Sequence, residues 1–148
     1  MPDKIKLISS FYEKIPADAI ENTFTKEFIR KTLKGRFGVY ALWNDRELYY
    51  IGQGKLYSRI ISHYKRDKHV GKWNKFSFAI LNHQEYAEEI ESLLLSFAMK
   101  MPPGNKNMSQ KLVRDINTEQ TISKILELAN GNKGKVKIPS SESAGTTV

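Results

Sequence analysis

Arg59 and His63 are a pair of residues whose types and spacing suit chemistry on a phosphate. They are four residues apart in a segment whose apolar residues recur at helical spacing, so both side chains project from one face of a helix. A guanidinium can hold a phosphate through two hydrogen bonds, and an imidazole beside it can move a proton near neutral pH. The pair therefore indicates one half of a site for phosphodiester hydrolysis.

Glu91 is the candidate for the other half. It falls on a predicted helix that runs from Gln84 to about Lys100, and it lies close to the apolar residues Ala87 and Leu94 on one face. A carboxylate in that position needs a partner, because burying an unpaired charge is costly. A cation and a salt bridge with Arg59 or a lysine both remain open as partners.

Two short triplets, Gly38-Val39-Tyr40 and Tyr50-Ile51-Gly52, precede these groups. Each lies in a segment rich in aromatic and β-branched residues, which predicts a strand. Tyrosines on paired strands and glycines that flank a hairpin are commonly structural, and taken alone each of these residues has that simpler interpretation.

A small domain of mixed α and β structure is expected to position these residues. Phe37–Trp43 and Glu47–Gly52 predict a β-hairpin, because Asn44-Asp45 between them is a turn signal. A helix follows over about residues 56–66, and the alternation over residues 76–80 predicts a third strand.

Residues 1–36 are predicted to form a helical amino-terminal extension. Pro16 can begin a short helix, and Thr25 can cap a second one that runs to Lys34 and stops at Gly35.

The remaining helices follow the third strand. The helix that carries Glu91 is expected to end at Pro102-Pro103-Gly104. Its predicted inward stripe consists of Ala87, Ile90, Leu94, Phe97 and Met101. Residues 108–131 predict a carboxy-terminal helical extension that packs on the domain, and residues 132–148 predict a flexible tail because they hold few large apolar groups.

The chain carries 24 lysines and arginines against 16 acidic residues, a formal charge of +8, which favours a polyanionic partner such as nucleic acid. The candidate DNA-contacting residues are Lys55, Lys65, Arg66, Lys68, Lys72 and Lys75. Because cysteine is absent, disulfides, thiolate zinc sites and cysteine nucleophiles are excluded. No stretch has the length of a membrane span, so a soluble, cytoplasmic protein without a membrane partner is expected.

Several separated motifs, taken in order, resemble those of the GIY-YIG nuclease family, which includes repair excinucleases, homing endonucleases and some restriction enzymes. The matching residues are Gly38-Val39-Tyr40, Tyr50-Ile51-Gly52, Arg59, His63, Glu91 and the segment Pro102 to Asn105. The similarity covers about residues 37–107, and residues 1–36 lie before it.

This resemblance implies an α+β domain built on a three-stranded antiparallel sheet flanked by helices. It also implies an endonuclease that hydrolyses DNA phosphodiester bonds with Mg²⁺ or Mn²⁺ on Glu91, RNA being a possible partner as well. By the same resemblance Tyr40 or Tyr50 activates water, Arg59 stabilises the developing charge and His63 assists proton transfer. An electropositive setting would favour the phenolate of either tyrosine.

Gly38, Gly52 and Asn105 are expected to be structural members of the motif. Gln53 departs from the family pattern, because many members carry lysine directly after the second triplet and here Lys55 comes two positions later. Glutamine can donate a hydrogen bond but adds no positive charge.

Two other functions remain open. One is a catalytically weakened nucleic-acid-binding module with the same fold, and the other is a protein-interaction domain that uses the helix over residues 118–130. A protein partner could supply the specificity. His69 and His83 have no ligand spacing and are expected at the surface, whereas Trp73 and Phe76 are expected in the core rather than stacked on a base.

Overall fold

The computed structural model describes residues 6–98, 100–105 and 116–131. The chain divides into two compact units, Met1–Lys111 and Leu112–Val148, and each is described by itself. The tail predicted over residues 132–148 lies outside the described residues. Within the described part, no helix is long and apolar enough to cross a membrane.

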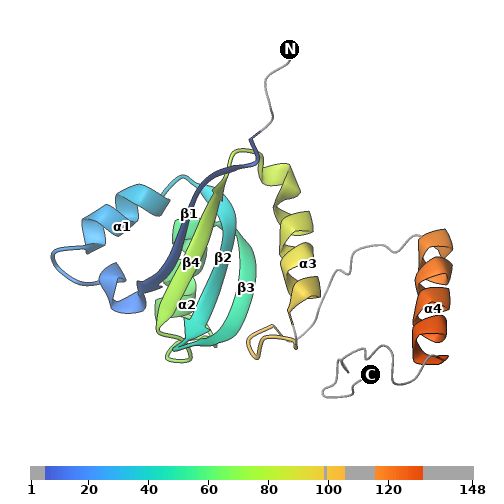
Figure 1. Cartoon of the computed structure of the whole chain (residues 1–148). Coiled ribbons are helices and arrows are strands. Elements are labelled where there is room, and N and C mark those ends of the chain that lie inside the picture. Colours follow the sequence, from blue (N-terminus) through green and yellow to red (C-terminus); the bar gives the residue numbers. More distant parts are fainter. Residues whose placement is uncertain (1–5, 99, 106–115, 132–148) are drawn as a thin grey trace, which may run out of the picture. The chain divides into compact units, whose positions relative to one another are not determined.

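The first unit is built on a four-stranded antiparallel sheet (Figure 1). Its strands are β1 (Ile8–Pro16), β2 (Phe37–Asn44), β3 (Glu47–Lys55) and β4 (Lys75–Leu81). They lie in the order β1-β4-β2-β3, so β2 and β4 are central and β3 is an edge strand. The three predicted strands and the antiparallel hairpin are confirmed, whereas the prediction of three strands in all is wrong.

The fourth strand, β1, comes from the segment that was expected to be helical. Its pairing with β4 is interrupted by two register shifts, and Lys14 within it has a positive φ. Most of its side chains are exposed, so its sequence lacks the alternation that marks a half-buried strand.

The rest of the amino-terminal segment is helical as predicted. A 3-10 helix η1 (Ala17–Ile20) begins after Pro16, and α1 (Lys26–Leu33) begins after Thr25. Thr25 does not cap α1 with its side chain, because its hydroxyl donates to the carbonyl oxygen of Ala19 instead.

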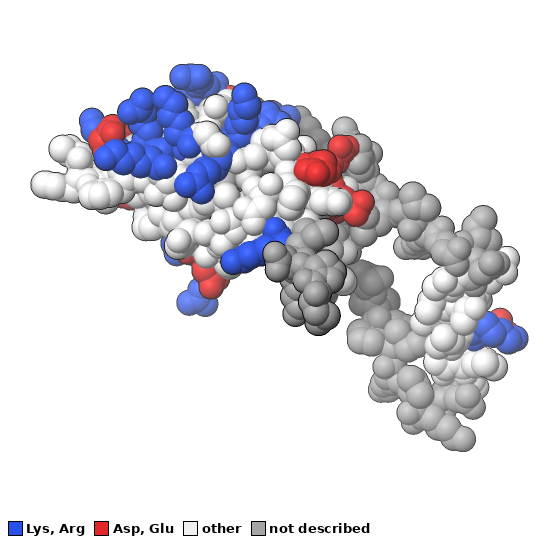
Figure 2. Space-filling view, turned by 90° about the horizontal axis from the view of Figure 1, so that it is seen from above, with Lys and Arg blue, Asp and Glu red and all other residues white. Residues whose placement is uncertain are grey.

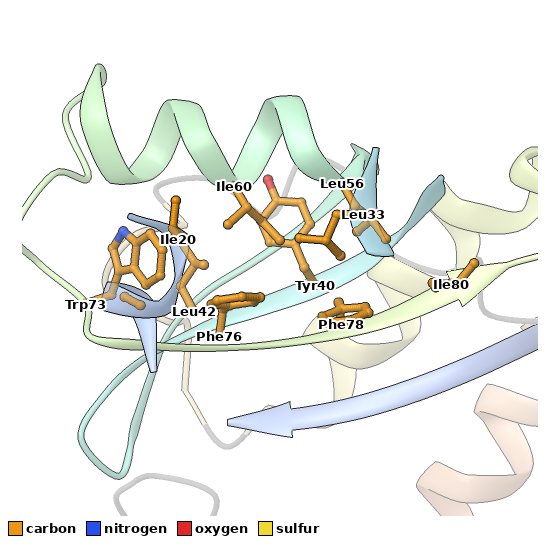
Figure 3. Close-up of a cluster of buried hydrophobic side chains, with 11 residues drawn as sticks. Ile20, Leu33, Tyr40, Leu42, Leu56, Ile60, Trp73, Phe76, Phe78 and Ile80 are labelled. Atoms are coloured by element: carbon orange, nitrogen blue, oxygen red, sulfur yellow. The ribbon is translucent and has the colours of Figure 1, made fainter. Parts of the chain in front are cut away.

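One face of the sheet is covered by α2 (Leu56–Lys65), with α1 beside it. Figure 3 shows the buried cluster between α2 and the sheet. It consists of Ala17, Ile20, Leu33, Tyr40, Leu42, Leu56, Ile60, Trp73, Phe76, Phe78 and Ile80. Trp73 and Phe76 are therefore core residues, as predicted, and are not available to stack on a base.

The opposite face of the sheet carries α3 (Ala87–Phe97), which follows a short 3-10 helix η2 (Gln84–Tyr86). Val39, Ile51 and Leu81 form a second cluster there with residues of α3. Since successive side chains of a strand point to opposite faces, Val39 and Tyr40 enter different clusters.

The predicted inward stripe of α3 is partly wrong. Ala87 is buried, Ile90 and Met101 are half-buried, but Leu94 and Phe97 are exposed, the latter by 79%. Leu95 is buried in place of Leu94, and the helix ends at Phe97 because Ala98 is extended. Glu91 lies one turn from Ala87 and one turn from Leu95, so it still belongs to the inward face.

The second unit contains α4 (Ile116–Gly131), which confirms the predicted helix. Its packing on the domain stays a prediction.

Gly38 is required by close contact between strands. A β-carbon added there would overlap the carbonyl oxygen of Ala79 on β4, and it would also lie 3.1 Å from the side chain of Leu56. Gly38 lies within β2 rather than in a turn, so the interpretation of a mere turn glycine is wrong for this residue.

We expect Gly38→Ala to lower the free energy of unfolding by about 1–3 kcal/mol or more, because the β2 and β4 backbones must separate to admit the methyl group. Chemical denaturation measures this. Gly131→Ala is the matched control, because a β-carbon there meets no atom within 4 Å, and it should be neutral or slightly stabilising. Equal stability of Gly38→Ala and wild type would contradict the argument.

Candidate functional site

A buried hydrogen bond joins the first triplet to the helix that carries Arg59 and His63. The Tyr40 hydroxyl on β2 lies 2.7 Å from Nε2 of His63 on α2, and Tyr40 is only 2% exposed. Tyr40 lies opposite Gly52 in the β2–β3 register. A β-carbon at Gly52 would lie 2.5 Å from the Tyr40 oxygen and 2.7 Å from Cε2 of Tyr50, so only glycine leaves room for both rings.

Asp67 fixes the state of His63 from the other side of the ring. Its Oδ2 lies 2.6 Å from Nδ1 of His63. Partial burial favours the neutral acid, but hydrogen bonds from the His69 amide and from His63 outweigh it and hold the pKa of Asp67 below its ordinary value. A carboxylate only accepts, so Nδ1 of His63 carries the hydrogen and donates it.

The other ring nitrogen of His63 is then an acceptor. Burial lowers the pKa of His63 below its ordinary value, although Asp67 opposes this shift, so the imidazole is neutral at pH 7. The Tyr40 hydroxyl therefore donates to Nε2, which has a free lone pair. The three groups form a carboxylate–imidazole–phenol chain.

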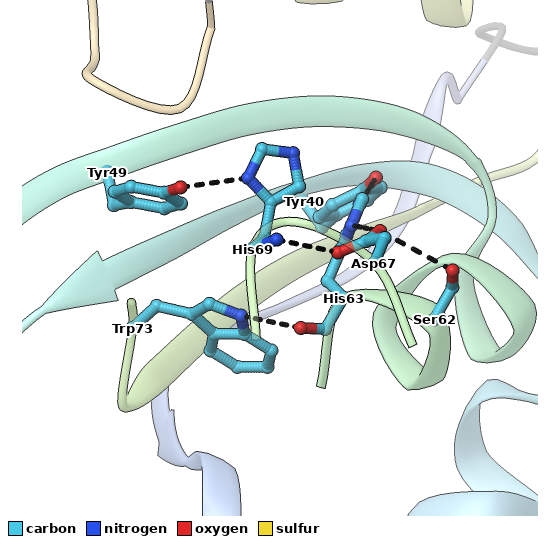
Figure 4. Close-up of polar contacts among 7 residues, drawn as sticks. All are labelled: Tyr40, Tyr49, Ser62, His63, Asp67, His69 and Trp73. Carbon is cyan, nitrogen blue, oxygen red and sulfur yellow. Dashed lines mark hydrogen bonds and ion pairs between the residues drawn. The ribbon is translucent and has the colours of Figure 1, made fainter. Parts of the chain in front are cut away.

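The loop after α2 holds this chain in place (Figure 4). Asp67 also accepts from the backbone N–H of His69 at 2.9 Å and from the Ser62 hydroxyl at 3.4 Å. His69 in turn is fixed at Nδ1, which lies 2.8 Å from the Tyr49 hydroxyl. Trp73 donates from its indole N–H to the His63 carbonyl oxygen at 3.2 Å.

Sequence reasoning missed Asp67 and Tyr49, and it placed His69 wrongly. His69 is buried rather than at the surface, because the loop folds back and turns its ring onto the sheet, and His83 is half-buried. The spacing of four residues between His63 and Asp67 is a signal that could have identified the carboxylate. Nothing in the spacing identifies Tyr49 as the partner of His69.

The protonation state of Tyr40 and Tyr50 differs from the phenolate that was expected. Burial and the neighbouring Tyr50 raise the pKa of Tyr40 well above its ordinary value, and Arg59 only partly opposes this. Burial also raises the pKa of Tyr50, again against an opposing effect of Arg59. Both side chains are therefore neutral phenols at pH 7, and an electropositive setting does not ionise them.

Tyr50 is the more accessible of the pair. It is half-buried on β3, and its ring centroid lies 5.1 Å from that of His63 and 4.8 Å from that of His69. The structure thus separates two tyrosines that the sequence left equivalent: Tyr40 contacts His63 inside the core, and Tyr50 borders it.

Arg59 is an exposed cation at the border of this cluster. It lies on α2 one turn before His63, and its side chain passes Gly54, where a β-carbon would lie 3.2 Å from Nε. Gly54 has a φ of +138°, which also favours glycine. Arg59 shifts the pKa values of both site tyrosines, of His63 and of Glu91, so it is close enough to act on all of them.

Glu91 reaches the same place from α3. Burial raises its pKa, the neighbouring Glu88 raises it further, and Arg59 opposes the shift. Among the described residues, neither Glu91 nor Arg59 forms an ion pair with an N···O distance of 4.0 Å or less. The structure therefore does not show the salt bridge that was one interpretation of Glu91. A half-buried carboxylate without a cationic partner suits a divalent cation such as Mg²⁺ or Mn²⁺, which prefers oxygen ligands.

A second set of possible metal ligands is His63, Asp67 and His69, whose ligand atoms lie within 4.8 Å of one another. These residues could hold a metal ion. However, Nδ1 of His63 and Oδ2 of Asp67 are only 2.6 Å apart, whereas two ligands on one tetrahedral zinc ion are separated by about 3.4 Å. As the structure stands, the three residues form a hydrogen-bonded network.

Asn105 ties the end of the motif to β3. Its amide oxygen accepts from the backbone N–H of Ile51 at 2.8 Å, and its amide nitrogen donates to the Ile51 carbonyl oxygen at 2.8 Å. The N–H of Gly104 also donates to the Tyr49 carbonyl oxygen at 2.6 Å. These contacts lie along the edge of β3 and hold the segment that contains Gly104 and Asn105 against that strand.

Five of the six candidate DNA-contacting residues are exposed, namely Lys55, Lys65, Arg66, Lys68 and Lys72, and Lys75 is half-buried at the start of β4. Lys68 and Lys72 lower the pKa of His69, after the larger effects of burial and His63, so their charges act within the site. Figure 2 shows Lys and Arg gathered toward one end of one face, where few acidic side chains lie. Gln53 is half-buried on β3, paired with Val39.

Comparison with known proteins gave no match: no family model, no curated protein and no solved structure is detectably similar to this chain.

We expect Tyr40→Phe to lower the free energy of unfolding at pH 7 by about 1 kcal/mol, because it leaves Nε2 of His63 without its donor. The difference from wild type should shrink above about pH 10. The folded-state pKa of Tyr40 lies above that of the unfolded chain, so its stabilising contribution is complete below about pH 10 and is lost as the pH rises further. Urea unfolding at a series of pH values measures this.

Tyr12→Phe is the control for the same change on an exposed ring, since Tyr12 is 51% exposed. A constant stability difference between Tyr40→Phe and wild type across the pH series would contradict the assigned state of Tyr40.

Proposed function

We propose that this protein is a GIY-YIG-type endonuclease that hydrolyses phosphodiester bonds of DNA with the help of a divalent cation. The observation that carries the proposal is that five side chains from four elements are linked by a hydrogen bond, by ring contacts or by the electrostatic effects of their charges on one another. These are Tyr40, Tyr50, Arg59, His63 and Glu91. They combine a proton-accepting chain, an exposed guanidinium and a carboxylate that forms no ion pair with the described residues, which are the groups that phosphodiester hydrolysis needs.

Arg59 would bind a non-bridging oxygen of the scissile phosphate. Its exposure leaves the guanidinium free to approach a polymer, and its positive charge stabilises the extra negative charge of the pentavalent transition state. The exposed lysines and arginine after α2 would bind neighbouring phosphates and hold the strand in place.

The phenols would act without ionising. Tyr50, half-buried, would orient the attacking water by a hydrogen bond. The proton that this water loses would pass to the hydroxyl oxygen of Tyr40, which would give its own proton to Nε2 of His63, 2.7 Å away. Asp67 would hold the tautomer of His63 and stabilise the imidazolium that forms.

Glu91 would hold Mg²⁺ or Mn²⁺ through its carboxylate. When bound, such a cation would neutralise charge on the phosphate and make a coordinated water more acidic. The raised pKa of Glu91 fits this role, because a cation would relieve the cost of a half-buried carboxylate beside Glu88.

Glu91→Gln is expected to reduce cleavage by about a hundredfold or more without destabilising the fold. The folded-state pKa of Glu91 is raised, so at pH 7 its charge disfavours folding, and glutamine removes that cost. The assay compares labelled duplex, branched and single-stranded DNA, and RNA, with Mg²⁺, Mn²⁺ or chelator. Thermal unfolding should show an equal or higher Tm.

Glu89→Gln is the matched control on the same helix, because Glu89 is exposed, and it should cleave as the wild type does. Full cleavage by Glu91→Gln would contradict the role of this carboxylate. Binding without cleavage under every metal condition would contradict the nuclease and favour a nucleic-acid-binding module.

Asp67→Asn is expected to slow cleavage by about tenfold or more, because an amide can donate to Nδ1 of His63 and so disturb the tautomer that accepts the proton from Tyr40. Asp67 raises the pKa of His63, so the acid limb of the pH–rate profile should move to lower pH in the variant. An unchanged profile would show that Asp67 does not act through His63.

A further inference from the structure

Two phenylalanines at the start of α1 are among the most exposed large side chains of the described residues. Phe24 is 84% exposed and Phe28 is 72% exposed. They are four residues apart around the Thr25 cap, with Phe24 held in a turn by a hydrogen bond from its N–H to the Asn22 side chain at 2.8 Å. Neither belongs to a buried cluster, so packing within the first unit does not account for them.

The surroundings of these rings are basic. Helix α1 and the residues after it carry Lys26, Arg30, Lys31, Lys34 and Arg36, all exposed, of which Lys31 lies one turn from Phe28. Glu27 is the acidic residue within α1, and it pairs with Arg30 at 3.7 Å. Ile29 and Leu33 face the core, Phe28 and Lys31 lie on the outward side of α1, and Lys26 and Arg30 lie on its flank.

The segments that flank α1 are both hydrogen-bonded to α2, the helix that carries Arg59 and His63. The Leu56 N–H at the start of α2 donates to the Arg36 carbonyl oxygen at 3.0 Å. At the other end the Tyr64 hydroxyl donates to Glu21 at 3.0 Å. The two helices therefore run side by side, and the basic face toward which Figure 2 shows Lys and Arg gathering lies at the end of the molecule where α1 is found.

We propose that Phe24, Phe28 and the cations of α1 form a binding surface for single-stranded or unpaired nucleic acid. Aromatic rings among positive charges are the combination that such strands recognise, because bases stack on the rings while cations contact the phosphates. In duplex DNA the bases are already stacked on each other, so the rings add little there. The surface would place the unpaired segment beside the site on α2 and would give the enzyme a preference for branched or flapped substrates.

The positive charge of this surface favours a nucleic acid over a second protein as its binding partner. A protein interface core is depleted in charged residues, whereas α1 and the residues after it carry five exposed lysines and arginines against the single glutamate of α1. The choice of a nucleic acid rests on the proposed function, but the surface itself requires no cleavage.

The test is binding without cleavage, measured by fluorescence anisotropy in chelator with a single strand, a flapped duplex and a blunt duplex of equal length. Phe24→Ala/Phe28→Ala should weaken binding of the single strand by about ten- to hundredfold and leave blunt-duplex binding nearly unchanged. Phe11→Ala/Phe97→Ala is the matched control, since these rings are 60% and 79% exposed outside α1, and it should bind as the wild type does.

A charge variant separates the two contributions. Lys26→Gln/Lys31→Gln should weaken single-strand and duplex binding alike and lower the dependence of affinity on salt concentration. All variants change exposed residues, and circular dichroism and Tm check that each is folded.

Unchanged single-strand affinity in Phe24→Ala/Phe28→Ala would overturn the proposal. A variant that changes its oligomeric state in sedimentation but keeps its single-strand affinity would also overturn the proposal, because α1 would then be an interface between copies of the chain. If the wild type binds single strands through these rings but never cleaves, the proposed nuclease function is refuted and the binding surface is not. If the protein cleaves and loss of the rings changes neither binding nor cleavage, the binding surface is refuted and the nuclease function is not.

Discussion

The hydrogen bond between Tyr40 and His63 is the contact on which both the core and the candidate site depend. It joins the central strand β2 to α2 inside the main buried cluster, where an unpaired partner would cost about 1–3 kcal/mol. Gly52 makes the bond possible, because any side chain there would occupy the space of the Tyr40 hydroxyl. One glycine thus fixes how the sheet and the site helix pack against each other.

The site contains two kinds of polar group with opposite energetics. The chain from Asp67 through His63 to Tyr40 is fully hydrogen-bonded and stabilises the fold. Glu91, in contrast, lies half-buried without an ion pair in the described part of the chain and has a raised pKa. Under the proposed function, a cation bound to this carboxylate would offset the cost of its burial.

The sequence predicted the hairpin, α2 and the third strand well, because each has a clear period and a turn signal at its end. It failed for β1, whose pairing is irregular and whose side chains are mostly exposed, so no alternation marks it. The sequence also predicted the wrong buried leucine on α3. Leu94 and Leu95 are adjacent, so only the packing of α3 on the sheet determines that Leu95 is the buried one. The roles of the site residues stay predictions, whereas the expected phenolate of Tyr40 or Tyr50 is wrong, since the burial that raises both pKa values cannot be judged from residue types.

Because β3 is at the edge of the sheet, it leaves a route by which residues from opposite faces could act together, as the proposed function requires. Helix α2 covers one face and α3 the other, so Arg59 and Glu91 can approach each other only around an edge. Gly52 and Gly54 place no side chain at that edge. Asn105 is held against it by two hydrogen bonds to the backbone of Ile51. Because Arg59 remains exposed, a site built there is open to a polymer lying across it, whereas an enclosed cavity would admit only a small molecule.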